Sequence, residues 1–148
     1  MLSSKAKYAV RALVFIADRH ARAPWVPTGD IAAAEAIPRK FLEAILVELR
    51  DHGLVEGRRG ALGGHRLARA PDAISLADVI RVIDGPLALT PCASVTDFHP
   101  CTDCTDIASC RLQHVMRRAR DAVAEVLENC SLASLAAKGV ETAPVPLD

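Results

Sequence analysis

The sequence predicts a mainly α-helical chain with a small β-hairpin, ordered as a winged helix-turn-helix, a cysteine-bearing loop and a long helix. Three observations predict this fold class. Apolar residues recur at helical spacing, a glycine-rich basic tip separates two short strand-like runs, and four cysteines fall within nineteen residues. With 148 residues and 51% hydrophobic content, the chain can bury one core, so we expect a single domain.

The N-terminal segment has the pattern of an amphipathic helix. Ser3 or Ser4 can cap this helix, because each is a good N-cap residue placed just before the first apolar position. Apolar residues then recur at helical spacing from residue 6 to residue 17, which predicts a helix that runs to about Arg19. Residues 20–27 contain two prolines and are expected to form a loop.

Two further helices are predicted after this loop. Thr28 is expected to cap a short helix over residues 29–36. Pro38 suits the first turn of a third helix, which carries an apolar stripe and is ended by Gly53. The tight break between the second and third helices, at Ala36 and Ile37, indicates a helix-turn-helix.

A glycine-rich, basic stretch follows the third helix. Residues 54–57 and 65–68 are short strand-like runs, and residues 58–64 separate them. A glycine-rich loop can also hold the phosphates of a nucleotide, but such a loop normally follows a strand and opens a helix. Because this one joins two strands, we interpret it as the tip of a β-hairpin wing.

A fourth helix and a long fifth helix are predicted on either side of the cysteine loop. Ser75 and Asp78 form a capping-box-like start for the fourth helix, and Gly85 ends it. The long helix reaches about Asn129, and Ser131 starts a last short helix. The apolar stripe of the long helix exceeds what one small domain can cover, so we expect it to pair with a second subunit; the alternative is an ordinary core helix. This stripe consists of Leu112, Val115, Met116, Ala119, Val123, Val126 and Leu127.

The net charge of zero conceals a strong division along the chain. Residues 1–70 hold 12 Lys and Arg against 7 Asp and Glu, a net charge of +5, whereas residues 71–148 carry −5. A polyanion is therefore expected to dock on the first half. On charge alone, nucleic acid would meet the predicted helix-turn-helix and wing.

The four clustered cysteines indicate a metal centre. Thiolates are soft ligands that select zinc, Cu(I) or iron–sulfur clusters. The chain has five cysteines, an odd number that fits a fully paired disulfide framework poorly. Cys130 stands apart from the cluster and is expected to be a small buried apolar residue. The candidate ligands are Cys92, Cys101, Cys104 and Cys110.

The chain shows no targeting or membrane-spanning pattern. Lys5, Lys7 and Arg11 interrupt the apolar residues near the N-terminus, which argues against a secretory signal. Its apolar runs are shorter than the roughly 18 residues that span a bilayer. We expect a cytoplasmic protein with no membrane partner, in a compartment where thiols stay reduced and clustered cysteines bind metal.

The chain resembles the bacterial winged-helix iron–sulfur transcriptional regulators, the family that includes IscR and NsrR. The resemblance is carried by residues 5–12, 41–55 and 59–65 and by the cysteine loop, in the same order, and it covers about residues 1–135. It implies a homodimeric transcription factor, usually a repressor, that binds a double-stranded DNA operator. It also implies that operator affinity is controlled by an iron–sulfur cluster that senses iron, nitric oxide or redox state.

The cysteine spacing departs from that of the better-known relatives, which use three cysteines separated by five residues each. Cys104 and Cys110 reproduce one such interval, but the position six residues before Cys104 is Phe98. The third thiolate must then come from Cys101 or Cys92, and either all four thiols bind one cluster or three do. Both [2Fe–2S] and [4Fe–4S] centres remain open, because four cysteines hold either.

Zinc is the alternative cofactor. Four thiolates complete a closed tetrahedral zinc site, and Cys101 and Cys104 have the spacing of half of one. The chain would then be a winged-helix DNA-binding protein with a structural zinc site and no sensing role. His99 and His114 are weaker candidates for a nitrogen ligand. Acidic residues also lie near the thiols, but nothing else assembles a catalytic constellation, so we expect no enzyme activity.

The predicted helix-turn-helix and wing assign roles in DNA binding. We expect the third helix to enter the major groove with its N-terminal end, while Phe41, Leu42 and Ile45 face inward. The start of the first helix is placed for backbone phosphates, and the wing for an adjacent minor groove or the backbone. The candidate DNA-binding residues are Ser4, Lys5, Lys7, Tyr8, Arg39, Lys40, Glu43, Arg58, Arg59, His65 and Arg66.

These assignments divide the chain into four regions. Residues 1–85 are the predicted winged helix-turn-helix DNA-binding region, and residues 86–109 are the cysteine-rich cluster-binding loop. Residues 110–138 contain the predicted dimerisation helix and a short C-terminal helix. Residues 139–148 are predicted to be a flexible tail.

Overall fold

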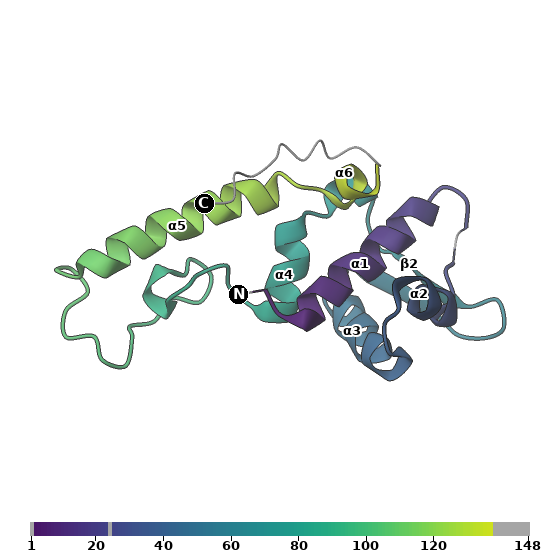
Figure 1. The fold of residues 1–148 in the computed structure, drawn as a ribbon, viewed down its shortest axis with the longest axis horizontal. Helices are drawn as coiled ribbons and strands as arrows, with labels where there is room; N and C mark the ends of the chain where they lie inside the picture. Colours follow the sequence, from purple (N-terminus) through teal and green to yellow (C-terminus); the bar gives the residue numbers. More distant parts are fainter. Residues whose placement is uncertain (1, 24, 138–148) are drawn as a thin grey trace.

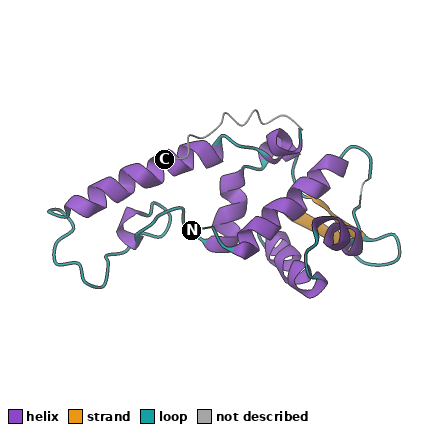
Figure 2. Cartoon of the chain, in the orientation of Figure 1, coloured by secondary structure: helices purple, strands orange, loops and turns teal. Residues whose placement is uncertain are grey.

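The computed structural model describes residues 2–23 and 25–137, and its elements follow the predicted order (Figures 1 and 2). The mainly helical fold with a two-stranded antiparallel hairpin is confirmed. The predicted tail, residues 139–148, lies outside the described residues. The elements are α1 (Ser4–Arg19), α2 (Thr28–Glu35), α3 (Arg39–Asp51), β1 (Val55–Arg58), β2 (Gly64–Leu67), η1 (Pro71–Ala73), α4 (Leu76–Asp84), η2 (Pro91–Ala93), α5 (Arg111–Glu128) and α6 (Leu132–Ala136), where η1 and η2 are 3₁₀ helices.

Helix α1 is the centre of the core. It packs against α2, α3, α4, α6 and β2, and its inward positions are fully buried. Helix α6 returns from the far end of the chain to lie beside α1, with Leu132 completely buried (Figure 1). Burial of each large apolar side chain contributes about 1.5–3 kcal/mol. The core therefore joins the N-terminal helices and the last described helix in one unit.

The N-terminus of α1 is capped by Ser3, one of the two serines predicted for this role. Its hydroxyl accepts a hydrogen bond from the Ala6 N–H at 2.9 Å, which satisfies one of the free amides of the first turn. The Ser3 N–H in turn donates to Asp84 at 2.8 Å. Because Asp84 is the last residue of α4, this contact ties the start of α1 to the end of α4.

The turn between α2 and α3 lies where it was predicted, but the cap of α2 does not. Ala36 adopts a left-handed conformation with φ of 49°, and the Ile37 N–H donates to the Ala32 carbonyl at 3.0 Å. The prediction that Thr28 caps α2 is wrong: Pro27 occupies the cap position and Thr28 is the first helical residue. The hydroxyl of Thr28 instead lies 3.3 Å from His65 Nδ1 on the wing.

The stripe of α3 differs from the prediction at one residue. Leu42 and Ile45 are fully buried, as predicted, but Phe41 is 39% exposed. Its ring packs edge-on against Tyr8 of α1, with the two ring centroids 5.8 Å apart. Phe41 therefore fills the space between the starts of α1 and α3 rather than the core. Gly53, with φ of 72°, follows the end of α3 as predicted.

Both strands of the wing lie one residue closer to its tip than predicted. Val55 pairs with Leu67 and both are buried, so these residues anchor the hairpin to the core. Strand β2 is also held by Val26, which exchanges two backbone hydrogen bonds of 2.8 Å with His65. A Cβ atom at Gly64 would lie 2.4 Å from the Val26 carbonyl oxygen, so this close approach requires glycine.

Helix α5 extends away from the winged-helix body, and the cysteine loop reaches out beneath it (Figure 1). It contacts α4 and η2, and Ala124 is its buried residue. Helix α4, which receives these contacts, starts at the predicted capping box of Ser75 and Asp78. Much of the predicted stripe of α5 faces outward, with exposed fractions of 45–68% at four of its residues. These are Leu112, Val115, Val123 and Val126.

Cys130 was expected to be buried, but it is only partly buried, with its Sγ 3.9 Å from the Ser134 hydroxyl. The reason is that it lies after α5 has ended, where the chain turns back towards the core. Among the described residues, no helix is both long and apolar enough to cross a membrane.

Candidate cysteine centre and DNA interface

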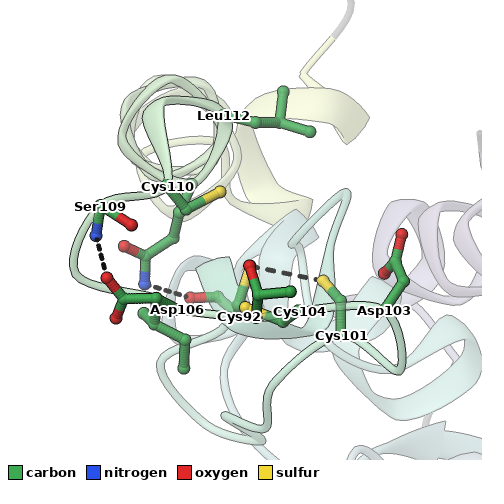
Figure 3. Close-up of a pocket in the computed structure, with 11 residues that line it drawn as sticks. Cys92, Cys101, Asp103, Cys104, Asp106, Ser109, Cys110 and Leu112 are labelled. Carbon is green, nitrogen blue, oxygen red and sulfur yellow. Dashed lines mark hydrogen bonds between the residues drawn. The ribbon is translucent and has the colours of Figure 1, made fainter.

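All four predicted ligand cysteines line one hollow of about 320 Å³ (Figure 3). Cys92 is buried in η2, Cys101 and Cys104 lie in the extended loop, and Cys110 occupies the N-cap position of α5. The loop therefore places Cys92 and Cys110 at its two ends, and Cys101 and Cys104 between them, around one hollow. The four candidate ligands named from the sequence lie together in the structure.

The Cys92 and Cys101 thiols are in direct contact. Their Sγ atoms lie 3.7 Å apart, and the hydrogen bond between them raises the pKa of the Cys101 thiol, with burial adding to the effect. Two thiolates bound to one tetrahedral ion with bonds of about 2.3 Å stand roughly 3.8 Å apart. The contact therefore has the spacing of two ligands of a single metal ion.

Hydrogen bonds shape both ends of this loop. Gln113 of α5 donates through Nε2 to the Cys92 carbonyl at 3.1 Å, which joins the start of α5 to η2. The Asp106 carboxylate accepts a backbone hydrogen bond from Ser109 at 3.2 Å (Figure 3) and another from Ala108 at 3.0 Å. Hydrogen bonds from Ser109 and then Ala108 lower the pKa of Asp106. Asp106 therefore stabilises the turn that leads into Cys110.

The donor set fits a thiolate-bound centre in its chemistry. Sulfur ligands suit zinc or an iron–sulfur cluster and disfavour the hard ions that prefer oxygen. Within residues 2–23 and 25–137, however, no three His, Cys, Asp or Glu side chains already converge closely enough to hold a metal ion. Neither His99 nor His114 lines the hollow, and His99 lies 3.8 Å from Asp97 at the surface. Binding would thus require the loop to draw its thiols inward.

A second hollow, of about 380 Å³, lies between α2, α3 and the wing. Its lining includes Arg39 at the start of α3, together with Arg58 and His65 of the hairpin. Burial lowers the pKa of His65, and the nearby Arg50 guanidinium adds to that effect. Arg39 also pairs with Glu43 at 3.0 Å across one turn of α3. Three candidate DNA-binding side chains therefore surround one concave surface.

The other candidates fall into paired and solvent-facing groups. Lys5 is paired with Glu48 of α3, and Arg66 with Glu56 across the hairpin at 2.6 Å. Tyr8 is engaged with Phe41. In contrast, exposed surface is found at Ser4, Lys7, Lys40 and Arg59. The ion pairs show that Lys5 and Arg66 have structural partners in addition to any part in binding.

Sequence reasoning missed Trp25, which belongs to the same face. Its ring lies against the guanidinium groups of Arg66 and Arg58, at 4.6 Å and 5.9 Å from the ring centroid. The available sequence signal is that Trp25 is the chain's sole tryptophan. It directly precedes Val26, the residue that bridges to β2. The pairing that brings it to the wing spans about forty residues and is not visible as a local pattern.

The family follows from comparison with known proteins. A family model for Rrf2, described as an iron-dependent transcriptional regulator, matches residues 2–138. The chain belongs to the Rrf2 family. A protein of Rhodobacter capsulatus named as an rrf2-like HTH-type transcriptional regulator is 38% identical over 141 residues, which cover 94% of each chain. The HTH-type transcriptional regulator CymR of Bacillus subtilis is 33% identical, over 91% of this chain and 88% of that protein.

Solved structures agree with this assignment. The structure of CymR, the global cysteine regulator of B. subtilis, matches with a TM-score of 0.74 at 32% identity, covering 92% of this chain and 95% of that chain. The structure of IscR from T. potens matches with a TM-score of 0.70 at 27% identity, covering 91% and 85%. This Rrf2 protein is therefore a DNA-binding transcriptional regulator with the winged-helix fold, a role without enzymatic chemistry.

Proposed function

We propose that this Rrf2 protein is a homodimeric, cytoplasmic repressor whose operator affinity is controlled by an iron–sulfur cluster bound to Cys92, Cys101, Cys104 and Cys110. The observation that carries the proposal is the convergence of these four thiols on one hollow from η2, the loop and the start of α5. The cluster would respond to iron, nitric oxide or redox state. In this proposal residues 1–85 bind DNA, residues 86–109 bind the cluster and residues 110–138 form the dimer interface.

Iron is favoured over zinc by the family, whose description names iron dependence. The 3.7 Å contact between the Cys92 and Cys101 sulfur atoms suits two thiolates on one tetrahedral ion. Both [2Fe–2S] and [4Fe–4S] centres stay open within the iron–sulfur proposal, because four cysteines hold either. A structural zinc site without sensing is the alternative that metal analysis distinguishes.

A physical route connects the thiols to the DNA-binding region. Gln113 links α5 to Cys92, and Arg81 of α4 is paired with Glu128 near the end of α5. Helix α4 packs against α1 and α3, and Asp84 at its end binds Ser3. A ligand shifts a conformational equilibrium only by binding one state better than the other. Drawing the loop thiols together would therefore favour one placement of α5 relative to α4 and the recognition helices.

The apolar face of α5 supports the proposed homodimer. Four large aliphatic side chains on this helix are about half exposed or more, whereas Leu13 and Ile16 on the inward face of α1 are buried. Pairing with the same helix of a second copy would remove the exposed apolar surface of α5 from water. A twofold dimer would also present two α3 helices to two half-sites of an operator.

The proposal predicts a difference in DNA affinity between the loaded and stripped protein. An operator would be selected from a random-sequence duplex pool, and its affinity measured anaerobically for protein with quantified iron and sulfide and for chelator-treated protein. We expect the two affinities to differ by at least about fivefold, the lower end of typical allosteric coupling. Equal affinities at full and zero iron content would contradict cluster control.

The wing is expected to contact DNA through its exposed arginines. The double variant Arg58→Ala/Arg59→Ala should bind duplex DNA more weakly and with a smaller salt dependence, because fewer counterions are released. The slope of log K against log salt should become shallower by about 0.9 for each phosphate that the variant no longer neutralises. The matched control is Arg117→Ala/Arg118→Ala, an exposed arginine doublet on α5. If the slope of log K against log salt is unchanged in the wing variant, the proposed contact between the wing and DNA is contradicted.

A further inference from the structure

Trp25 occupies a defined place on the outer face of the wing. Its neighbour Val26 is joined to His65 by a pair of antiparallel backbone hydrogen bonds, each 2.8 Å long. In that register the residue before Val26 stands opposite the residue after His65, so Trp25 faces Arg66. Arg66 in turn is paired with Glu56 across β1 and β2. A row of three side chains therefore crosses the face, from the tryptophan through the arginine to the glutamate.

The tryptophan ring makes contact with two wing cations. The Arg66 guanidinium lies 4.6 Å from the ring centroid and the Arg58 guanidinium lies 5.9 Å away, both within the range of a cation–π interaction. Glu56 binds Arg66 with a nitrogen–oxygen distance of 2.6 Å. The Trp25 ring and the Glu56 carboxylate therefore both contact the Arg66 guanidinium. The same ring lies beside Arg58 at the base of the hairpin tip.

The backbone holds this arrangement in place. Gly64 lets β2 approach the Val26 carbonyl more closely than any residue with a Cβ atom would allow. Val26 itself is buried and belongs to the core. The position of Trp25 is therefore set by the domain core and the hairpin together, and not by the tip of the wing.

We infer that Trp25 is a positioning residue for DNA binding, whose indole ring holds Arg58 and Arg66 in the orientation in which the wing meets the DNA. This inference rests on the proposed contact between the wing and DNA. Free arginine side chains lose rotamer freedom when they bind, and ordering them beforehand reduces that loss. An aromatic face can do this without neutralising the charge that phosphate requires, since the ring carries no ionised group.

The test compares Trp25→Leu with Trp25→Phe, using a labelled mixed-sequence DNA duplex and fluorescence anisotropy. We expect Trp25→Leu to weaken binding about three- to tenfold, because leucine has no aromatic face to hold the two guanidinium groups. Trp25→Phe keeps an aromatic face and should recover most of the affinity. Equal affinity of Trp25→Leu and the parent protein, at equal thermal stability, would overturn the inference.

A double-mutant cycle separates positioning from a general structural role. If Trp25 acts through the two arginines, Trp25→Leu should have no further effect on DNA affinity in an Arg58→Ala/Arg66→Ala background. A further loss of the same size would assign Trp25 a role independent of the arginines and overturn the inference. If Trp25→Leu leaves DNA affinity unchanged while Arg58→Ala/Arg59→Ala weakens binding, the positioning role is rejected. The proposed contact between the wing and DNA is then retained.

The parent protein provides a measurement that needs no tryptophan variant. Because Trp25 is the sole tryptophan, its emission reports only on this site. Adding the mixed-sequence duplex should change that emission as the arginines beside the ring engage phosphate, and the change should disappear in Arg58→Ala/Arg66→Ala. Emission that is unaffected by saturating DNA would contradict the inference even if Trp25→Leu fails to fold.

Discussion

Cys104→Ser is expected to abolish the visible colour of anaerobically purified protein and to reduce its iron and acid-labile sulfide content to near zero. Cys104 lies in the middle of the cysteine loop and lines the shared hollow, so its loss removes one of the ligands that the loop must draw inward. Serine has nearly the same shape but is a poor ligand for the soft iron centres that thiolates bind. Absorbance spectra with iron and sulfide assays measure the effect.

The control for this variant is Cys130→Ser. Cys130 lies beyond α5 and is not among the residues that line the hollow, so its replacement should leave the colour and the iron content unchanged. Circular dichroism should give the same helix content for both variants and the parent protein. A colourless parent protein that contains stoichiometric zinc and no iron would overturn the cluster proposal and support the structural zinc alternative.

The second large effect is expected on assembly. Val126→Glu should convert the proposed dimer into a monomer, because each subunit would place a carboxylate in an apolar interface. Val126 is 68% exposed, so the change should cost the isolated subunit little stability. An uncompensated buried charge costs about 3 kcal/mol or more, and a twofold interface contains the substitution twice. Sedimentation equilibrium of the two proteins measures the change.

Arg118→Gln is the matched control for assembly. It changes the net charge by the same amount as Val126→Glu, and Arg118 is an exposed residue of α5 outside the apolar stripe. We expect this variant to remain dimeric and to bind a two-half-site operator normally. A parent protein that sediments as a monomer at micromolar concentration would contradict the dimer proposal, and α5 would then be an unpaired helix.

Several features could be predicted from the sequence because their physical cause is local. Ser3 and Ser75 each accept a hydrogen bond from an amide in the first turn of the helix that they cap, and Asp78 accepts one from the backbone amide of Ser75. Gly53 ends α3 because it can adopt a positive φ. Soft thiols close together in a loop identify a class of metal centre from their chemistry alone. These conclusions do not require knowledge of which segments meet in space.

The predictions for Thr28 and Phe41 were wrong because each side chain contacts a segment that is distant in the sequence. The Thr28 hydroxyl was expected to cap its own helix, but it lies beside His65 of the wing, which is thirty-seven residues away. Phe41 was expected to be buried on helical periodicity, yet Tyr8 offers it a partner at the edge of the core. The same helical position can therefore face the core or a neighbouring helix, and periodicity does not distinguish them.

The sequence by itself determined the winged helix-turn-helix, the charge division between the halves and the set of four thiols. Only the tertiary structure decided that these thiols surround one hollow, that Lys5 and Arg66 are paired with carboxylates, and that Trp25 lies against two wing arginines. The physical reason is the range of the interactions. Helix caps, turns and periodicity act within a few residues, whereas ion pairs, aromatic contacts and shared cavities depend on how distant segments pack.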